Sequence, residues 1–217
     1  LFQDYPHEKP ARERGIVMGL PRVLAFWETM PFWNAFWRSL GFTIRLSAGS
    51  SHPLYESGLH AVTPDTVCFP AKLVHGHLRD LVGRGVDRIF MPSLAAMETE
   101  NSEKTSESMC AVVKGYPLVV KNSDNPQKEW GVPFDAPLFY WYRPEDRRRQ
   151  LAEYVKETFG IGKEEASAAV RFGEEAMEAF HSALREAGRQ ALETVRRENT
   201  WAVVLASRPY QNDSLVN

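Results

Sequence analysis

Short apolar runs alternate with helical apolar stripes in the first part of the chain. The run 16–20 (IVMGL) stops at Pro21, as a buried strand does. Segment 31–41 has aromatic and apolar residues three and four apart, begins with proline and ends with glycine, which predicts a helix with an aromatic core face. Residues 42–46 (FTIRL) then indicate a second strand. This order predicts a βαβ unit.

The same alternation returns after residue 66. Residues 67–70 lead into a predicted helix (AKLVHGHLRDLVGRG), which is followed by a strand at 87–91. We expect a loop over 94–109, a strand or strand–turn element over 110–121 and another loop over 122–135. Strands that alternate with helices are typical of a parallel sheet. The fold class predicted is therefore α/β, with a parallel, Rossmann-like sheet.

Charged helix formers dominate the later chain. Two helices separated at 160–162 are predicted between 144 and 199, and the apolar run 201–206 (WAVVLA) indicates a buried strand. We expect a tail or linker over 1–14, an α/β domain over 15–143 and a charged helical segment over 144–200. Residues 201–217 would begin a second α/β segment that is truncated at the end of the sequence.

Composition excludes several classes of protein. The 217 residues carry 26 Lys and Arg against 28 Asp and Glu, so the net charge of −2 gives no basic footprint for nucleic acid. No apolar run has the ~18 residues of a membrane span, and the first residues have no signal core. Two cysteines form no disulfide framework, which favours the reducing cytoplasm. No P-loop, G-x-G-x-x-G, G-x-S-x-G or H-E-x-x-H motif is present, so no nucleotide site is expected here.

The densest cluster of chemically active residues is DTVCFPAKLVHGH, residues 65–77. Cys68 stands just before a helix that a proline can open, and a helix N-terminus favours the thiolate that ligates iron or zinc. Lys72 and His75 follow along the same line of that helix, whereas His77 does not share a face with His75. A buried free cysteine with histidines on the helix surface is the other interpretation. Asp65 would cap this turn or act in proton transfer.

Cys110 comes 42 positions after Cys68, at the start of an apolar segment. Two isolated cysteines are a weaker metal signal than a C-x-x-C pair, and a tetrahedral site needs four ligands. Spacing alone indicates only an α/β domain.

A resemblance adds to this reading. The strings GLPRVL, PFWNAFWRSLGF, DTVCFPAKLVHGH, VDRIFMPS, GYPLVVK and ASRPYQND, in this order, resemble the domain of acyl-CoA dehydratase activase-related proteins, or CoA-substrate-specific enzyme activases. That domain is also similar to the iron–sulfur subunits of 2-hydroxyacyl-CoA dehydratases. The match covers about 15–125 and 200–217.

The resemblance implies an α/β domain that holds a [4Fe-4S] cluster through cysteines, with Cys68 and Cys110 as ligands and Lys72, His75 and Ser93 near the cluster. It implies a multidomain protein of anaerobic metabolism whose ATPase segment, upstream in the same chain, drives a low-potential electron to an acyl-CoA dehydratase. This segment would not be an active enzyme alone.

The sequence departs from the family pattern at several positions. Ser93 stands where the family has a cysteine, Cys110 is followed by alanine instead of proline, and Ser207 and Gln211 replace glycine and histidine in the closing motif. A serine oxygen is a harder and rarer iron ligand, so Ser93 should weaken the cluster.

Two functions follow from this comparison. One is a cluster-bearing electron-transfer domain. The alternative is a docking or scaffold domain that has lost its cluster and binds the ATPase segment or a dehydratase subunit. Zinc binding is a weaker third option.

Overall fold

The computed structural model describes residues 1–2, 12–62, 67–97, 108–141 and 143–217. Four strands form one parallel sheet in the order β2-β1-β3-β5, and β4 pairs with β6 in a separate parallel ribbon. The strands are β1 (Val17–Leu20), β2 (Thr43–Leu46), β3 (Arg88–Phe90), β4 (Ser93–Met97), β5 (Phe134–Asp135) and β6 (Leu138–Trp141). The predicted α/β class with a parallel sheet is confirmed.

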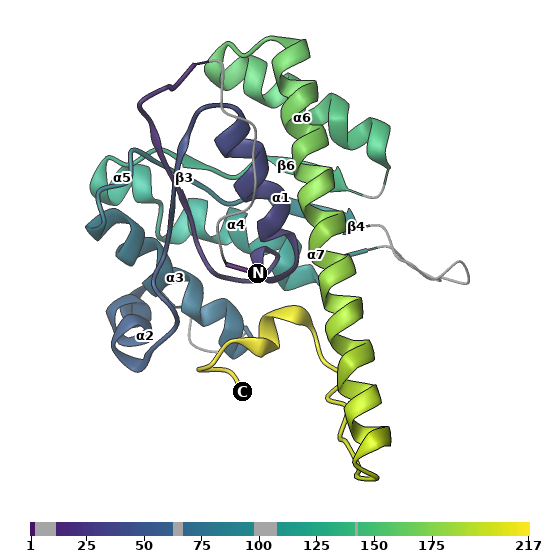
Figure 1. Ribbon diagram of the computed structural model, residues 1–217. Helices are drawn as coiled ribbons and strands as arrows, with labels where there is room; N and C mark the ends of the chain where they lie inside the picture. The colour runs from purple at the N-terminus through teal and green to yellow at the C-terminus, as the bar shows by residue number, and fades with distance from the viewer. Residues whose placement is uncertain (3–11, 63–66, 98–107, 142) are drawn as a thin grey trace.

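Seven α-helices and two 3-10 helices accompany these strands in the described chain. They are α1 (Phe26–Ser39), α2 (His52–Gly58), η1 (Leu59–Ala61), α3 (Phe69–Gly83), α4 (Ala111–Ser123), α5 (Pro126–Trp130), α6 (Pro144–Phe159), α7 (Lys163–Arg197) and η2 (Pro209–Asn212). The first half of α7 packs on α1, while its second half extends away from the body (Figure 1). The chain then returns, and η2 contacts α1.

The core forms around the aromatic face of α1, as predicted. Trp33 and Trp37 are both fully buried, and their rings lie 4.7 and 5.0 Å from the ring of Phe90 on β3. Trp33 also lies 5.0 Å from the ring of Trp141 on β6. Because ring–ring contacts add to the burial of apolar area, α1 joins the main sheet to the β4–β6 ribbon.

The strand predicted over 110–121 is wrong, because this segment is the helix α4. Val113, Tyr116 and Val120 are buried at helical spacing, while Leu118 and Val119 are exposed. A short apolar run fits a buried strand or a helix equally well by composition, so periodicity over its full length decides.

The loop predicted over 94–109 is also partly wrong. Residues 94–97 belong to β4, which pairs with β6, and residues 98–107 lie outside the described chain. Within 122–135, expected to be loop, the short helix α5 forms instead; Asn125 caps it by accepting a hydrogen bond from the Gln127 amide.

Segment 201–206 is not the buried strand that its composition predicts. Trp201 is 80% exposed and Val204 is 85% exposed, and none of the described strands pairs with the segment. Apolar and β-branched composition alone does not make a strand, since a strand needs a neighbour that accepts its backbone hydrogen bonds.

The two charged helices agree with their prediction. Helix α6 ends at Phe159 and α7 begins at Lys163, with Gly160 in the left-handed conformation (φ 69°) that commonly ends a helix. Among the described helices, none combines the length and apolarity needed to cross a lipid bilayer.

Candidate functional site

Cys68 occupies the N-cap position of α3, as the sequence predicts. Its carbonyl oxygen accepts hydrogen bonds from the amides of Ala71 and Lys72, at 3.0 and 3.3 Å, and Pro70 lies in the first turn. The residue is exposed. The first amides of α3, with the positive end of the helix dipole, therefore lie beside a thiol that reagents can reach. Asp65, proposed to cap this turn, lies outside the described residues.

Cys110 occupies the same position on α4 and is partly buried. The pKa of its thiol is lowered, first by the backbone amide of Val113 and then by that of Val112, while burial opposes the shift. The positive charge of Arg208 and the Tyr210 hydroxyl lower it further. Cys110 is thus a thiol whose surroundings favour the thiolate form.

Tyr210 on η2 links the two cysteines. The pKa of Tyr210 is raised first by burial and then by the negative charges of Cys110 and Cys68, against the opposing charge of Arg208. Both thiols therefore lie within electrostatic reach of one phenol, although they are 42 positions apart in the sequence. We call Cys68, Cys110, Tyr210 and Arg208 the thiol site.

Ser93 and Lys72 are the other residues that the resemblance implies near the cluster. Lys72 is close to Cys68 in the sequence, and Ser93 contacts the helix that begins after Cys110. Ser93 begins β4, is buried, and donates its hydroxyl hydrogen bond to the carbonyl of Lys114 in the first turn of α4. Its oxygen therefore faces the helix that Cys110 starts. Lys72 lies one turn after Cys68 and is partly exposed.

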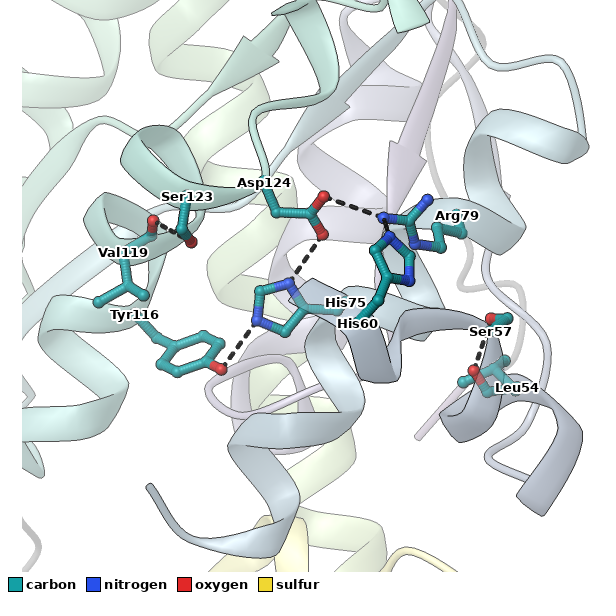
Figure 2. Close-up of polar contacts among 9 residues, drawn as sticks. All are labelled: Leu54, Ser57, His60, His75, Arg79, Tyr116, Val119, Ser123 and Asp124. Carbon is teal, nitrogen blue, oxygen red and sulfur yellow. Dashed lines mark hydrogen bonds and ion pairs between the residues drawn. The ribbon is translucent and has the colours of Figure 1, made fainter. Parts of the chain in front are cut away.

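His75 belongs to a buried polar network between α3 and the end of α4 (Figure 2). Its Nδ1 lies 2.8 Å from Oδ2 of Asp124, and its Nε2 lies 3.0 Å from the Tyr116 hydroxyl. Arg79 donates to the other oxygen of Asp124 at 3.1 Å and stacks 4.6 Å from the centre of the Trp130 ring. His75 is 1% exposed and Asp124 is 3% exposed, so this network is part of the core.

Tyr116 connects this network to Cys68. Burial raises the pKa of Tyr116 to about 12, and the charges of Cys68 and Asp124 add to the shift. The interpretation of the histidines as surface groups is wrong, because both His75 and His77 are buried.

His77 belongs to a different network, at the carboxyl end of β2. Its Nδ1 is 2.7 Å from the hydroxyl of Ser47 and its Nε2 is 3.0 Å from the hydroxyl of Ser50, which in turn donates to Asp213. The two histidines face different partners, as their spacing predicts. Burial lowers the pKa of His77 to about 4, against the charges of Asp213 and Asp80, which raise it.

We expect His77 to make the free energy of unfolding depend on pH. Its pKa is about 4 in the folded chain against 6.5 unfolded, so the unfolded state takes up the proton first. The contribution of neutral His77 to the free energy of unfolding is fully present above pH 6.5. It is lost as the pH falls towards 4, by about 3 kcal/mol in total. Urea unfolding of the wild type and of His77→Gln at several pH values measures this. Equal pH dependence in the two proteins would contradict the assignment.

The thiol site offers two of the four ligands that a [4Fe-4S] cluster needs. Within the described ranges, no three His, Cys, Asp or Glu side chains form a group that could hold a metal ion. The donor chemistry of the two cysteines fits iron, since thiolates at helix N-termini are soft ligands. Ser93 presents an oxygen already engaged with the α4 backbone. Among the described residues, the two cysteines therefore supply two of the four ligands of such a cluster.

Reasoning from sequence missed the parts of this site that depend on long-range contacts. Tyr116 and Asp124 carry no local motif, and the tertiary packing of α3 against α4 brings them to His75. Arg79 lies one turn after His75 on α3, and its contact with Asp124 depends on the same packing. For Arg208 and Tyr210, the shared closing motif was the available signal, but it gave no contact with Cys110.

Comparison with known proteins gives one match. The family model described as the CoA enzyme activase uncharacterised domain matches residues 17–217, which is most of the chain and includes every residue of the thiol site. No curated protein and no solved structure matches the chain.

Proposed function

Because the chain belongs to the family described as the CoA enzyme activase uncharacterised domain, we propose that it is an iron–sulfur-type domain that supports ATP-driven, low-potential electron transfer to an acyl-CoA dehydratase-like enzyme. The ATP-hydrolysing part would be another segment of the same protein. The partner would be a dehydratase-type enzyme that needs activation.

The observation that carries this proposal is that both cysteines lie at helix N-termini, Cys68 at the N-cap position of α3 and Cys110 at that of α4. They are the only cysteines in the sequence. Two thiols at helix N-termini supply soft ligands of the kind that an iron–sulfur cluster needs.

When bound, an iron–sulfur cluster supplies reversible one-electron transfer. The chain's own part is to ligate through the two thiolates and to set the charge around them. The guanidinium of Arg208 and the amides at the start of α4 favour negative charge at Cys110. Hydrogen bonds to sulfur and nearby charge are the means by which a protein tunes such a site.

The alternative is a docking domain that works without a cluster. The observation that favours it is that Ser93, at the position where the family resemblance implies a cysteine, is buried and bonded to the Lys114 carbonyl. The exposed apolar segment with Trp201 and Val204 would then contribute to binding a partner.

Anaerobic reconstitution with iron and sulfide separates the two functions. For the electron-transfer domain, we expect iron and acid-labile sulfide to bind in equal amounts, up to about four of each per chain. The Ser93→Cys variant should bind at least as much, because it adds a thiolate beside α4. A chain that binds no iron, with or without this substitution, would overturn the proposal and favour the docking domain.

A further inference from the structure

The position of each cysteine is fixed by the helix that it precedes. The carbonyl oxygen of Cys68 accepts hydrogen bonds from the first turn of α3, and that of Cys110 accepts one from the Lys114 amide of α4 at 3.0 Å. Each cysteine is therefore part of the start of its helix. The distance between the two cysteines depends on how α3 and α4 are held against one another.

In the part of the chain that the structure describes, every hydrogen bond between α3 and α4 with its C-cap involves His75 or Arg79 (Figure 2). Nδ1 and Nε2 of His75 lie 2.8 Å from Oδ2 of Asp124 and 3.0 Å from the Tyr116 hydroxyl, and Arg79 donates to Oδ1 of Asp124 at 3.1 Å. Tyr116 lies within α4, and Asp124 is the C-cap of α4. We call these four side chains the α3–α4 clamp.

Burial makes the clamp selective for one arrangement of the two helices. His75, Tyr116 and Asp124 are 1%, 2% and 3% exposed, so water does not replace a lost partner. A shift of α4 along α3 would leave buried polar groups without hydrogen bonds, which costs free energy. Apolar contacts are not directional and oppose such a shift less strongly. The clamp therefore holds the two helices in one register.

The clamp lies at a similar distance along each helix from the cysteine. His75 comes seven positions after Cys68, and Tyr116 comes six positions after Cys110. At the rise of an α-helix, these separations are both about 10 Å, or about two turns. A small tilt of either helix at the clamp therefore moves its cysteine relative to the other one.

We propose that His75, Tyr116 and Asp124 are positioning residues that set the distance between Cys68 and Cys110 by holding α4 against α3. The inference rests on the proposed function for its purpose, because two ligands of one group have to be held at one separation. The distance itself is a property of the metal-free chain. None of the three positioning residues has to touch a thiol for this role.

Dipolar electron paramagnetic resonance on the metal-free chain measures this distance. The sequence has only two cysteines, so nitroxide labels attach at Cys68 and Cys110 alone. For the wild type, we expect one narrow distance distribution. Tyr116→Phe removes the hydroxyl and keeps the ring, and Asp124→Asn removes the charge that serves His75 and Arg79. Each variant should widen the distribution by about twofold or more, because the helices are then free to shift.

Two control variants separate positioning from general support of the fold. Tyr140→Phe changes a tyrosine that is 49% exposed and makes only backbone hydrogen bonds within the described chain. His77→Gln changes a buried histidine on α3 that bonds to Ser47 and Ser50 and not to the clamp. Both should keep the narrow distribution, even where His77→Gln lowers the stability.

The outcomes for the clamp and for the proposed function are distinct. A broad distribution in the wild type would overturn the clamp, and so would an unchanged width in both Tyr116→Phe and Asp124→Asn. Widening that is equal in His77→Gln would also overturn it, since any loss of stability would then have the same effect. A chain that binds no iron would contradict the proposed function and leave the measured distances as they are.

Discussion

Replacing Asp124 with alanine is expected to lower the free energy of unfolding by about 3–5 kcal/mol. The carboxylate is 3% exposed and serves two donors, His75 at 2.8 Å and Arg79 at 3.1 Å. Alanine leaves the imidazole and the guanidinium without their acceptor inside the protein, so the cost of burying those groups is no longer offset. Urea unfolding at pH 7 measures the loss.

Two comparison variants make the Asp124 result specific. Asp124→Asn keeps the shape and one acceptor oxygen, so its loss should be smaller than that of alanine. Glu186→Ala removes an ion pair with Arg189 on the exposed half of α7, and this change should leave stability almost unchanged. A loss of less than about 1 kcal/mol in Asp124→Ala would show that the His75 network does not stabilise the core.

Trp33→Ala is the second change with a large expected effect, also about 3–5 kcal/mol. The Trp33 ring is fully buried between α1, β3 and β6, and its Nε1 donates to the hydroxyl of Thr29 at 3.0 Å. Removing it leaves a cavity at the junction of the main sheet and the β4–β6 ribbon. We expect this to be measurable as a lower midpoint of thermal or urea unfolding.

The chain contains a matched control for this substitution. Trp201 is 80% exposed, so Trp201→Ala should change stability by no more than about 0.5 kcal/mol. Equal losses of stability from Trp33→Ala and Trp201→Ala would contradict both the buried position of Trp33 in the core and the exposed state of segment 201–206.

Local sequence signals predicted the first part of this fold well. The aromatic stripe of α1 and the cysteine–proline start of α3 are local patterns, and the structure has both. Segment 110–121 was mistaken for a strand because Val112, Val113, Val119 and Val120 suit a strand by composition, whereas burial follows the period of a helix.

The thiol site depends on contacts that no local pattern encodes. Cys110 and Tyr210 are 100 positions apart, and His75 and Asp124 are 49 apart. A single sequence shows which residue types are present but not which of them the packing of α3, α4 and η2 brings together. The resemblance to the activase-related family identified the two cysteines and the closing motif, while the effect of both thiols on the pKa of Tyr210 required the structure.

The amount of iron bound by Cys68→Ser after anaerobic reconstitution tests the central claim most directly. If Cys68 and Cys110 belong to one site, this single substitution removes all the iron and sulfide that the wild type binds, and Cys110→Ser does the same. Serine is close in size to cysteine, and Cys68 is exposed, so the fold should survive. Iron in Cys68→Ser equal to that of the wild type would show that Cys68 is not a ligand and would contradict the account.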